Sequence, residues 1–158
     1  MREIVEILEI ERKLFEEMKR SIEAQKIAMI DRDLDAMNEA LLRTERIAVE
    51  IDEIDRKRHE LFKSLKRSLN LSEDSSLEEL LAKLEGSDRE EFVDAISKFL
   101  SAVNDLAAEL EGLKEMMEFE NAYFEFLMGV LSGETRGVYD RKGSYGKALR
   151  TGSFSVRW

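Results

Sequence analysis

The longest unbroken apolar repeat in the sequence runs from Asp88 to Leu131 and reads DREEFVDAISKFLSAVNDLAAELEGLKEMMEFENAYFEFLMGVL. It contains no proline and places an apolar residue at every third or fourth position, which is the pattern of an amphipathic α-helix. Such a helix has about twelve turns and a length of roughly 65 Å, at about 1.5 Å per residue. We expect the rest of the chain to be organised around it.

The apolar side of this predicted helix changes along its length. The first half carries one row, which a single packing face can bury, and the second half carries two rows side by side. Together these two rows span roughly 180° of the helical wheel, more than the ~100° that one packing face needs. The single row is Phe92, Ile96, Phe99, Val103, Leu106 and Leu110; the two later rows are Leu113, Met117, Phe124, Leu127 and Leu131, and Met116, Phe119, Tyr123, Phe126 and Val130.

The second of these later rows is the best candidate for a binding surface. In a three-helix bundle each helix buries one row, so one later row is expected to pack on the bundle and the other needs a different partner. A helix drifts by about 20° per heptad against a 3.5-residue repeat, but drift does not add a new row of apolar residues. We therefore predict that Met116, Phe119, Tyr123, Phe126 and Val130 form a groove for an amphipathic helix of another chain.

Two further expectations concern this surface. Homodimerisation through the same residues is the direct alternative to binding a different chain. Glu120 lies inside the apolar sector, where an unpaired carboxylate is costly, so we expect it to face a cation or an amide of the partner, or to reach the rim of the groove.

The first half of the chain predicts two antiparallel helices. An amphipathic pattern covers about Glu3 to Ile30, and it breaks near Asp31 to Asp33, where an aspartate can cap the next helix. One unbroken helix through Asp33 is the alternative. The second helix, Leu34 to about Leu69, has heptad spacing over five heptads, which indicates coiled-coil-like packing. Its predicted seam is Leu34, Met37, Leu41, Thr44, Ala48, Ile51, Asp55, Arg58, Phe62, Leu65 and Leu69.

Two charged residues of this seam leave two interpretations open. Asp55 and Arg58 are three positions apart, close enough to pair with each other. In the first interpretation, they set the register of the seam and lower its stability. Alternatively, the seam rotates at this point and both side chains are solvated.

A break in the helical pattern separates the hairpin from the long helix. Asn70 to Ser75 reads as a loop, after which Ser76 and Glu79 match a capping box at the start of a short helix, Leu77 to Glu85. Gly86 is expected to terminate this short helix. Ser87 and Glu90 repeat the capping-box pattern before the long helix.

Composition excludes several classes of protein. The 158 residues include no cysteine and no proline, and the net charge is −10. Residues 134–158 carry six basic residues against two acids, a charge of +4, so the preceding body carries −14. An acidic body argues against nucleic acid as the main partner, although the tail interleaves aromatic and basic residues. No window approaches the ~18 apolar residues of a membrane span, so we expect a soluble protein without membrane insertion.

The sequence offers no catalytic or metal-binding pattern. A carboxylate-bridged metal site in a helical bundle uses Glu-x-x-His on two helices, whereas this chain has a single histidine, His59, with Arg56 three residues before it. We expect His59 to be a partly exposed neighbour of Asp55. The glycines after Ser132 follow no predicted strand, so they form no dinucleotide fingerprint. We predict that the protein is not an enzyme and needs no metal or cofactor.

These features predict one all-α fold with two parts. Residues 1–133 form an elongated antiparallel helical hairpin with one short and one very long helix, a three-helix coiled-coil-like bundle. Residues 134–158 form a basic, glycine-rich, flexible tail.

The order of these features resembles that of the FlgN-like flagellar export chaperones. The resemblance covers the hairpin with its turn at Asp31 to Leu34, the long helix with Asn121, and a Tyr-x-x-x-Gly segment that here reads from Tyr139 to Gly143. Family members usually have a glycine directly after this tyrosine, where this chain has Asp140.

The resemblance implies a cytoplasmic binding protein. Members of the family hold the C-terminal amphipathic segments of hook-filament junction proteins and deliver them to the type III export gate, and a tail tyrosine contacts the gate component FlhA. Carried over by position, Tyr139 and Gly143 become the candidate residues for docking to the gate. A structural coiled-coil homodimer without a client is the alternative.

Overall fold

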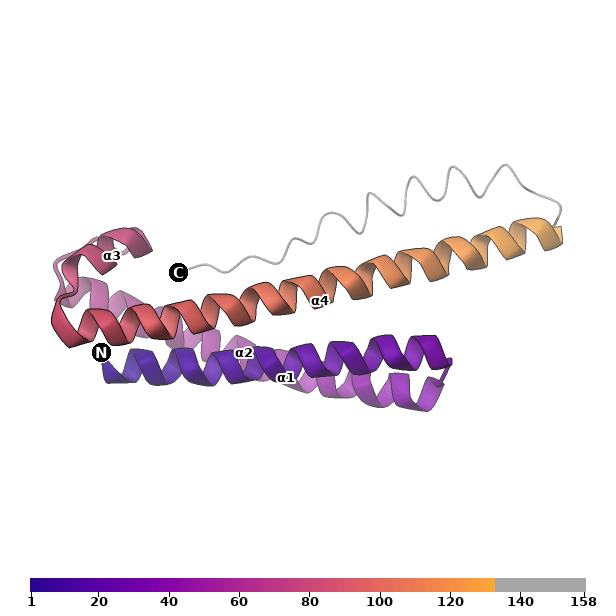
Figure 1. Ribbon diagram of the computed structural model, residues 1–158, viewed down its shortest axis with the longest axis horizontal. Coiled ribbons are helices and arrows are strands. Elements are labelled where there is room, and N and C mark those ends of the chain that lie inside the picture. The colour runs from indigo at the N-terminus through magenta and orange to yellow at the C-terminus, as the bar shows by residue number, and fades with distance from the viewer. Residues whose placement is uncertain (133–158) are drawn as a thin grey trace. The chain divides into compact units, whose positions relative to one another are not determined.

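The computed structural model describes residues 1–132 of the chain, and these residues form four α-helices without a strand. The helices are α1 (Arg2–Asp31), α2 (Leu34–Ser68), α3 (Leu77–Lys83) and α4 (Gly86–Ser132). The predicted all-α fold is confirmed (Figure 1). The described residues divide into two compact units, 1–106 and 107–132, and α4 continues from the first into the second.

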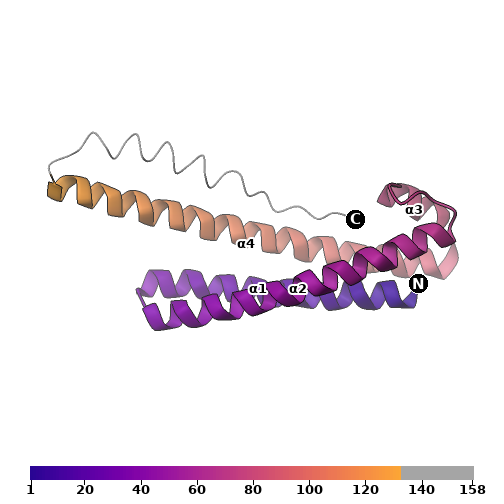
Figure 2. The ribbon, with the colours of Figure 1, turned by 180° about the vertical axis from the view of Figure 1, so that it is seen from behind.

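The predicted turn between the first two helices is confirmed. Arg32 adopts a left-handed conformation with φ 52°, which ends α1. Asp33 then caps α2, because its carboxylate accepts a hydrogen bond of 3.0 Å from the backbone N–H of Ala36. So short a connection makes α1 and α2 antiparallel neighbours, and they lie side by side in both views (Figures 1 and 2).

The face of α1 that packs in the first unit is mostly apolar, as its spacing predicts. It also contains three polar residues that the sequence pattern did not place there. Two of them join a polar cluster between α1 and α2: Thr44 accepts from Gln25 at 2.6 Å, and Ser21 lies 2.6 Å from the Thr44 hydroxyl and donates to the Ala40 carbonyl. The buried residues of α1 are Ile4, Ile7, Leu8, Glu11, Leu14, Phe15, Met18, Ser21, Ile22, Gln25 and Ala28.

The heptad register predicted for the first half of α2 is wrong at Leu34, Leu41 and Ala48, although Thr44 of the predicted seam does contact α1. Leu34 and Leu41 are exposed by 84% and 47%, while Ala40 and Ile47 are buried. Ile47 and Arg58 are eleven positions apart, a spacing of about 3.67 residues per turn that stays close to the natural period of a helix. A strict 3.5-residue repeat drifts away from that face within a few turns, so the prediction selected the neighbouring residues.

The capping box before α3 is confirmed, and the second one is not. The Ser76 hydroxyl accepts from the Glu79 N–H at 3.2 Å, and the Glu79 carboxylate accepts from the Ser76 N–H at 2.9 Å. The short helix ends at Lys83, two residues earlier than expected. Helix α4 already begins at Gly86, whose φ of 58° suits glycine, so Ser87 lies inside the first turn and not at the cap.

The first half of α4 completes the core of the first unit. Its predicted apolar row is buried from Phe92 to Leu106. The Phe99 ring lies 5.5 Å from the Phe15 ring of α1, and the Phe92 ring lies 5.9 Å from the Phe62 ring of α2, measured between centroids. The three long helices therefore share one hydrophobic core in this unit.

Candidate functional site

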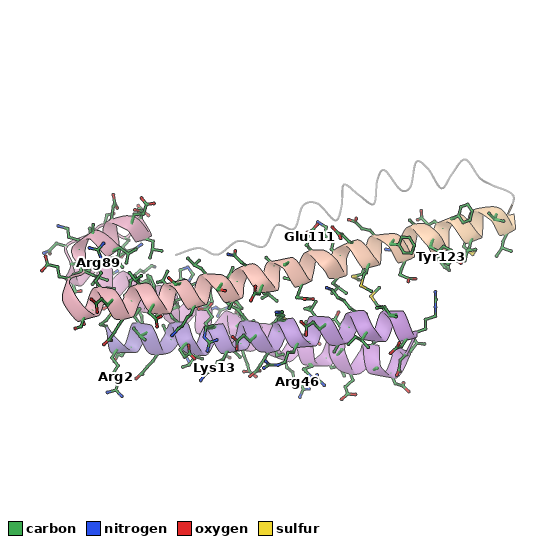
Figure 3. All side chains as sticks on the ribbon, in the orientation of Figure 1. Arg2, Lys13, Arg46, Arg89, Glu111 and Tyr123 are labelled. Atoms are coloured by element: carbon green, nitrogen blue, oxygen red, sulfur yellow. The ribbon has the colours of Figure 1, made fainter. Side chains whose placement is uncertain are left out.

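The predicted binding row lies on the part of α4 that belongs to the second unit, and most of it is exposed. Phe119 is 70% exposed, and Tyr123, Phe126 and Val130 are 47%, 55% and 54% exposed. Met116, at the start of the row, is half-buried. Figure 3 shows the Tyr123 side chain on this part of the helix. The structure thus brings all five residues onto one helix side, since they recur every three or four positions.

The neighbouring row is also exposed, which extends the apolar surface beyond the prediction. The sequence predicted that one of the two later rows would be covered by the bundle. Only Leu113 of this row is buried, while Met117, Phe124 and Leu131 are exposed by 43%, 63% and 81%. Leu127 is 39% exposed, and so the whole sector after Met116 is accessible along the described residues.

One exposed residue of this surface belonged to neither predicted row. Met128 is 51% exposed and lies four positions after Phe124. The wheel that gave the two rows could have identified it, because Met128 is apolar and stands at the edge of the sector. We name these exposed and half-buried apolar residues the α4 apolar surface: Met116, Met117, Phe119, Tyr123, Phe124, Phe126, Leu127, Met128, Val130 and Leu131.

The opposite side of the same helix segment is polar. Residues 107–132 contain six glutamates against one lysine, a net charge of −5. Glu118, Asn121 and Glu125 follow one another at spacings of three and four positions, which places them on one side of the helix. The segment is therefore a two-sided helix, with an apolar surface wider than a single packing face and an acidic reverse.

Glu120 stands within the apolar surface. It is half-buried, and residues 1–132 provide no hydrogen bond or salt bridge to it. The residues three and four positions before and after it are all apolar. These neighbours are Met116, Met117, Tyr123 and Phe124.

A second cluster of charged residues lies in the core of the first unit. Arg58 and Glu11 are both 1% exposed, and the Arg58 Nε donates to the Glu11 carboxylate at 2.7 Å. Arg58 also pairs with Asp55, whose side chain is 38% exposed. Of the two interpretations of this pair, the one with both side chains solvated is wrong, because Glu11 of α1 provides a buried partner for Arg58.

Burial gives this cluster its unusual titration. The pKa of Glu11 is raised to about 7: burial is the main cause, Arg58 opposes it, and the nearby Asp55 carboxylate adds to the rise. The Arg58 guanidinium also lies 5.4 Å from the centroid of the Phe99 ring. Packed on this ring and bound to two carboxylates, Arg58 is part of the core.

No catalytic arrangement accompanies these residues. His59 is 31% exposed and lies 3.4 Å from the Asp55 carboxylate, as predicted. Within residues 1–132 there is no group of three or more metal-ligating side chains, and none of the described helices is long and apolar enough to cross a membrane. Tyr139, Gly143 and the predicted tail lie outside the described residues.

Fold and site together define a class of protein. An all-helical chain with a wide apolar surface on one helix end has the arrangement expected of a module that binds other protein segments.

The comparison with protein families gives the family. The family model described as FlgN protein matches residues 1–147, and the chain therefore belongs to the FlgN family, as the sequence predicted. This is a family of flagellar export chaperones, not of enzymes. Searches of curated proteins and of solved structures gave no significant match.

Proposed function

We propose that this chain is a cytoplasmic flagellar export chaperone that binds the C-terminal amphipathic helix of hook-filament junction proteins and delivers them to the type III export gate. The exposure of the α4 apolar surface is the observation that carries this proposal. Monomeric soluble proteins rarely expose a contiguous apolar patch of this kind without a partner for it.

The client helix would lie along Met116, Phe119, Tyr123, Phe126 and Val130. Three of these residues are aromatic, and large aromatic side chains dominate the energetics of binding surfaces. Methionine adds an adaptable contact, which suits a surface that accepts more than one client sequence. A client helix with apolar residues at every third or fourth position would cover this row.

The test removes two aromatic anchors. In the variant with Phe119→Ser and Phe126→Ser, binding of a synthetic peptide from the C-terminus of a junction protein should be lost, because each anchor typically contributes about 2 kcal/mol or more. Circular dichroism should show unchanged helicity, since both side chains are more than half exposed. A matched control carries Ile27→Ser and Leu34→Ser, which remove two exposed apolar residues of the hairpin. Equal binding by both variants would refute the proposed site.

The alternative, a homodimer without a client, makes an opposite prediction. Sedimentation should give a monomer that binds the junction peptide if the protein is a chaperone. A tight dimer that dissociates when Phe119 and Phe126 are replaced would identify the same surface as a dimer interface.

Docking to the export gate is proposed for Tyr139 and Gly143. The family match extends to residue 147 and so includes both positions. Tyr139→Ala should leave binding of the junction peptide unchanged and weaken association with FlhA, measured with the purified gate component. Tyr145→Ala, a second tyrosine in the same region of the sequence, is the control. If the two variants bind FlhA equally well, the assignment of Tyr139 is wrong.

A further inference from the structure

Glu120 breaks the apolar character of the surface that the client helix would cover. It occupies a position whose neighbours one turn before and one turn after are Met116, Met117, Tyr123 and Phe124. Three of these four are more than two-fifths exposed, at 43%, 47% and 63%, and Met116 is half-buried. A helix that packs on them therefore also covers the carboxylate between them.

Covering this carboxylate is unfavourable unless the partner compensates its charge. A carboxylate transferred from water to an apolar contact loses its hydration, and the described part of the chain provides no salt bridge or hydrogen bond for Glu120. Lys114, which is the single cation of residues 107–132, stands six positions away and hence on a different side of the helix. Since the described residues offer Glu120 no cation, the bound helix is the source that we consider for the compensating group.

Glutamates elsewhere in the segment lie outside the apolar surface, unlike Glu120. Glu118 and Glu125 are half-buried like Glu120, but they lie on the polar side of the helix with Asn121 between them, so a helix on the apolar surface would not cover them. They keep the segment soluble without taking part in the contact. Glu120 alone combines a carboxylate with four apolar neighbours on the covered side.

We propose that Glu120 selects the client: the bound amphipathic helix carries one lysine or arginine inside its apolar face, and this cation pairs with the Glu120 carboxylate in the middle of the α4 apolar surface. The inference rests on the proposed function, because it assumes that a helix covers this surface. It adds a chemical requirement, since a client helix with an entirely apolar face would leave the carboxylate unpaired and bind more weakly.

The inference is tested by whether one substitution weakens or strengthens binding of the peptide. With the full chain and a synthetic junction-protein peptide, Glu120→Gln should weaken binding by roughly tenfold, the effect expected for a partly desolvated charge pair. If the client supplied no cation, the same substitution would remove only an unfavourable desolvation, and binding would stay equal or become tighter. Either of these results overturns the inference. Glu125→Gln, with the same charge change on the polar side, is the matched control and should change binding less than twofold, or about 0.4 kcal/mol.

A double-mutant cycle identifies the partner of Glu120. Each lysine and arginine of the peptide is replaced by glutamine in turn, and each peptide is measured against the wild-type chain and the Glu120→Gln variant. One peptide position should lose its effect in the variant background, because the pair has already been broken. Additive effects at every position would contradict the inference. Failure of the wild-type chain to bind the peptide at all would instead refute the proposed function, so the two failures are distinguishable.

Discussion

The buried cluster of Glu11, Arg58 and Asp55 predicts that the protein becomes less stable as the pH rises through neutrality. Burial raises the pKa of Glu11 from 4.5 to about 7 in the folded state. Between these two values the folded chain binds more protons at this position than the unfolded chain does. The free energy of unfolding therefore falls with increasing pH across this window, by linkage.

The size of the effect follows from the same values. At roughly 1.4 kcal/mol for each pH unit, a pKa that moves from 4.5 to about 7 corresponds to at most about 3 kcal/mol of stability, present below pH 4.5 and lost above pH 7. Two other carboxylates with shifted pKa values affect stability in a different pH range. Hydrogen bonds from Arg12 and Arg67 lower the pKa of Glu9 and Glu73, so their contributions disappear only when the pH falls below the ordinary carboxylate range.

Urea unfolding followed by circular dichroism, at about pH 5 and about pH 8, measures this effect. The wild-type chain should be less stable at the higher pH, while Glu11→Gln, which imitates the neutral acid, should be nearly equal at both. At the higher pH the variant should be the more stable protein. Glu6→Gln, at an exposed position of the same helix, should retain the pH dependence of the wild type. A wild-type stability that is flat or rises with pH, or a Glu11→Gln variant that is less stable at the higher pH, would refute the reasoning.

Two further predictions concern the packing of the first unit. Phe99→Ala should destabilise the fold by about 3–5 kcal/mol in urea unfolding, because the ring is fully buried against Phe15 and Arg58. Leu100→Ala, at a partly exposed neighbouring position, should have a much smaller effect. Equal effects of the two substitutions would contradict this account. Ser76→Ala should reduce stability by about 1 kcal/mol, because the capping box is lost. Ser87→Ala should have little effect, since Ser87 does not cap α4. A larger loss of stability for Ser87→Ala would show that the assigned start of α4 is wrong.

Local features of the sequence were sufficient to predict where the helices are. The absence of proline, the capping residues Asp33 and Ser76, and the periodic apolar spacing act within a few neighbouring residues, and the helix bounds in the structure differ from the predicted ones by only one or two positions. The all-α fold and the break between α1 and α2 follow from these local signals.

Features that depend on a second helix were predicted less well. The seam of α2 was assigned with a heptad repeat, and the true seam through Ala40 and Ile47 depends on how closely α1 approaches there. The burial of Glu11 was not predicted, because its partner, Arg58, is 47 positions away in the sequence. A pattern on one helix shows which residues are polar but not which polar residues meet.

The α4 apolar surface was predicted because its signal also lies within one helix. The number of apolar residues around the wheel exceeds what one packing face can bury, and this excess can be counted without knowing the partner. The exposure of the neighbouring row, from Met117 to Leu131, was not predicted, because a pattern within one helix does not show which of its rows another element covers. The surplus of apolar residues around the wheel predicted where the surface lies, and the structure shows how far it extends.

The acidic side of the same segment opposes self-association through such a surface. An exposed apolar patch promotes self-association, and net charge opposes it through repulsion between copies. With a net charge of −5 over residues 107–132, two copies that approach through their α4 surfaces bring a combined net charge of −10 together, which includes the two Glu120 carboxylates. The client helix that we propose would supply a cation and relieve this repulsion, whereas the same segment of a second copy would add to it. These glutamates would therefore favour the proposed basic client over self-association, and the preference should weaken as salt concentration rises.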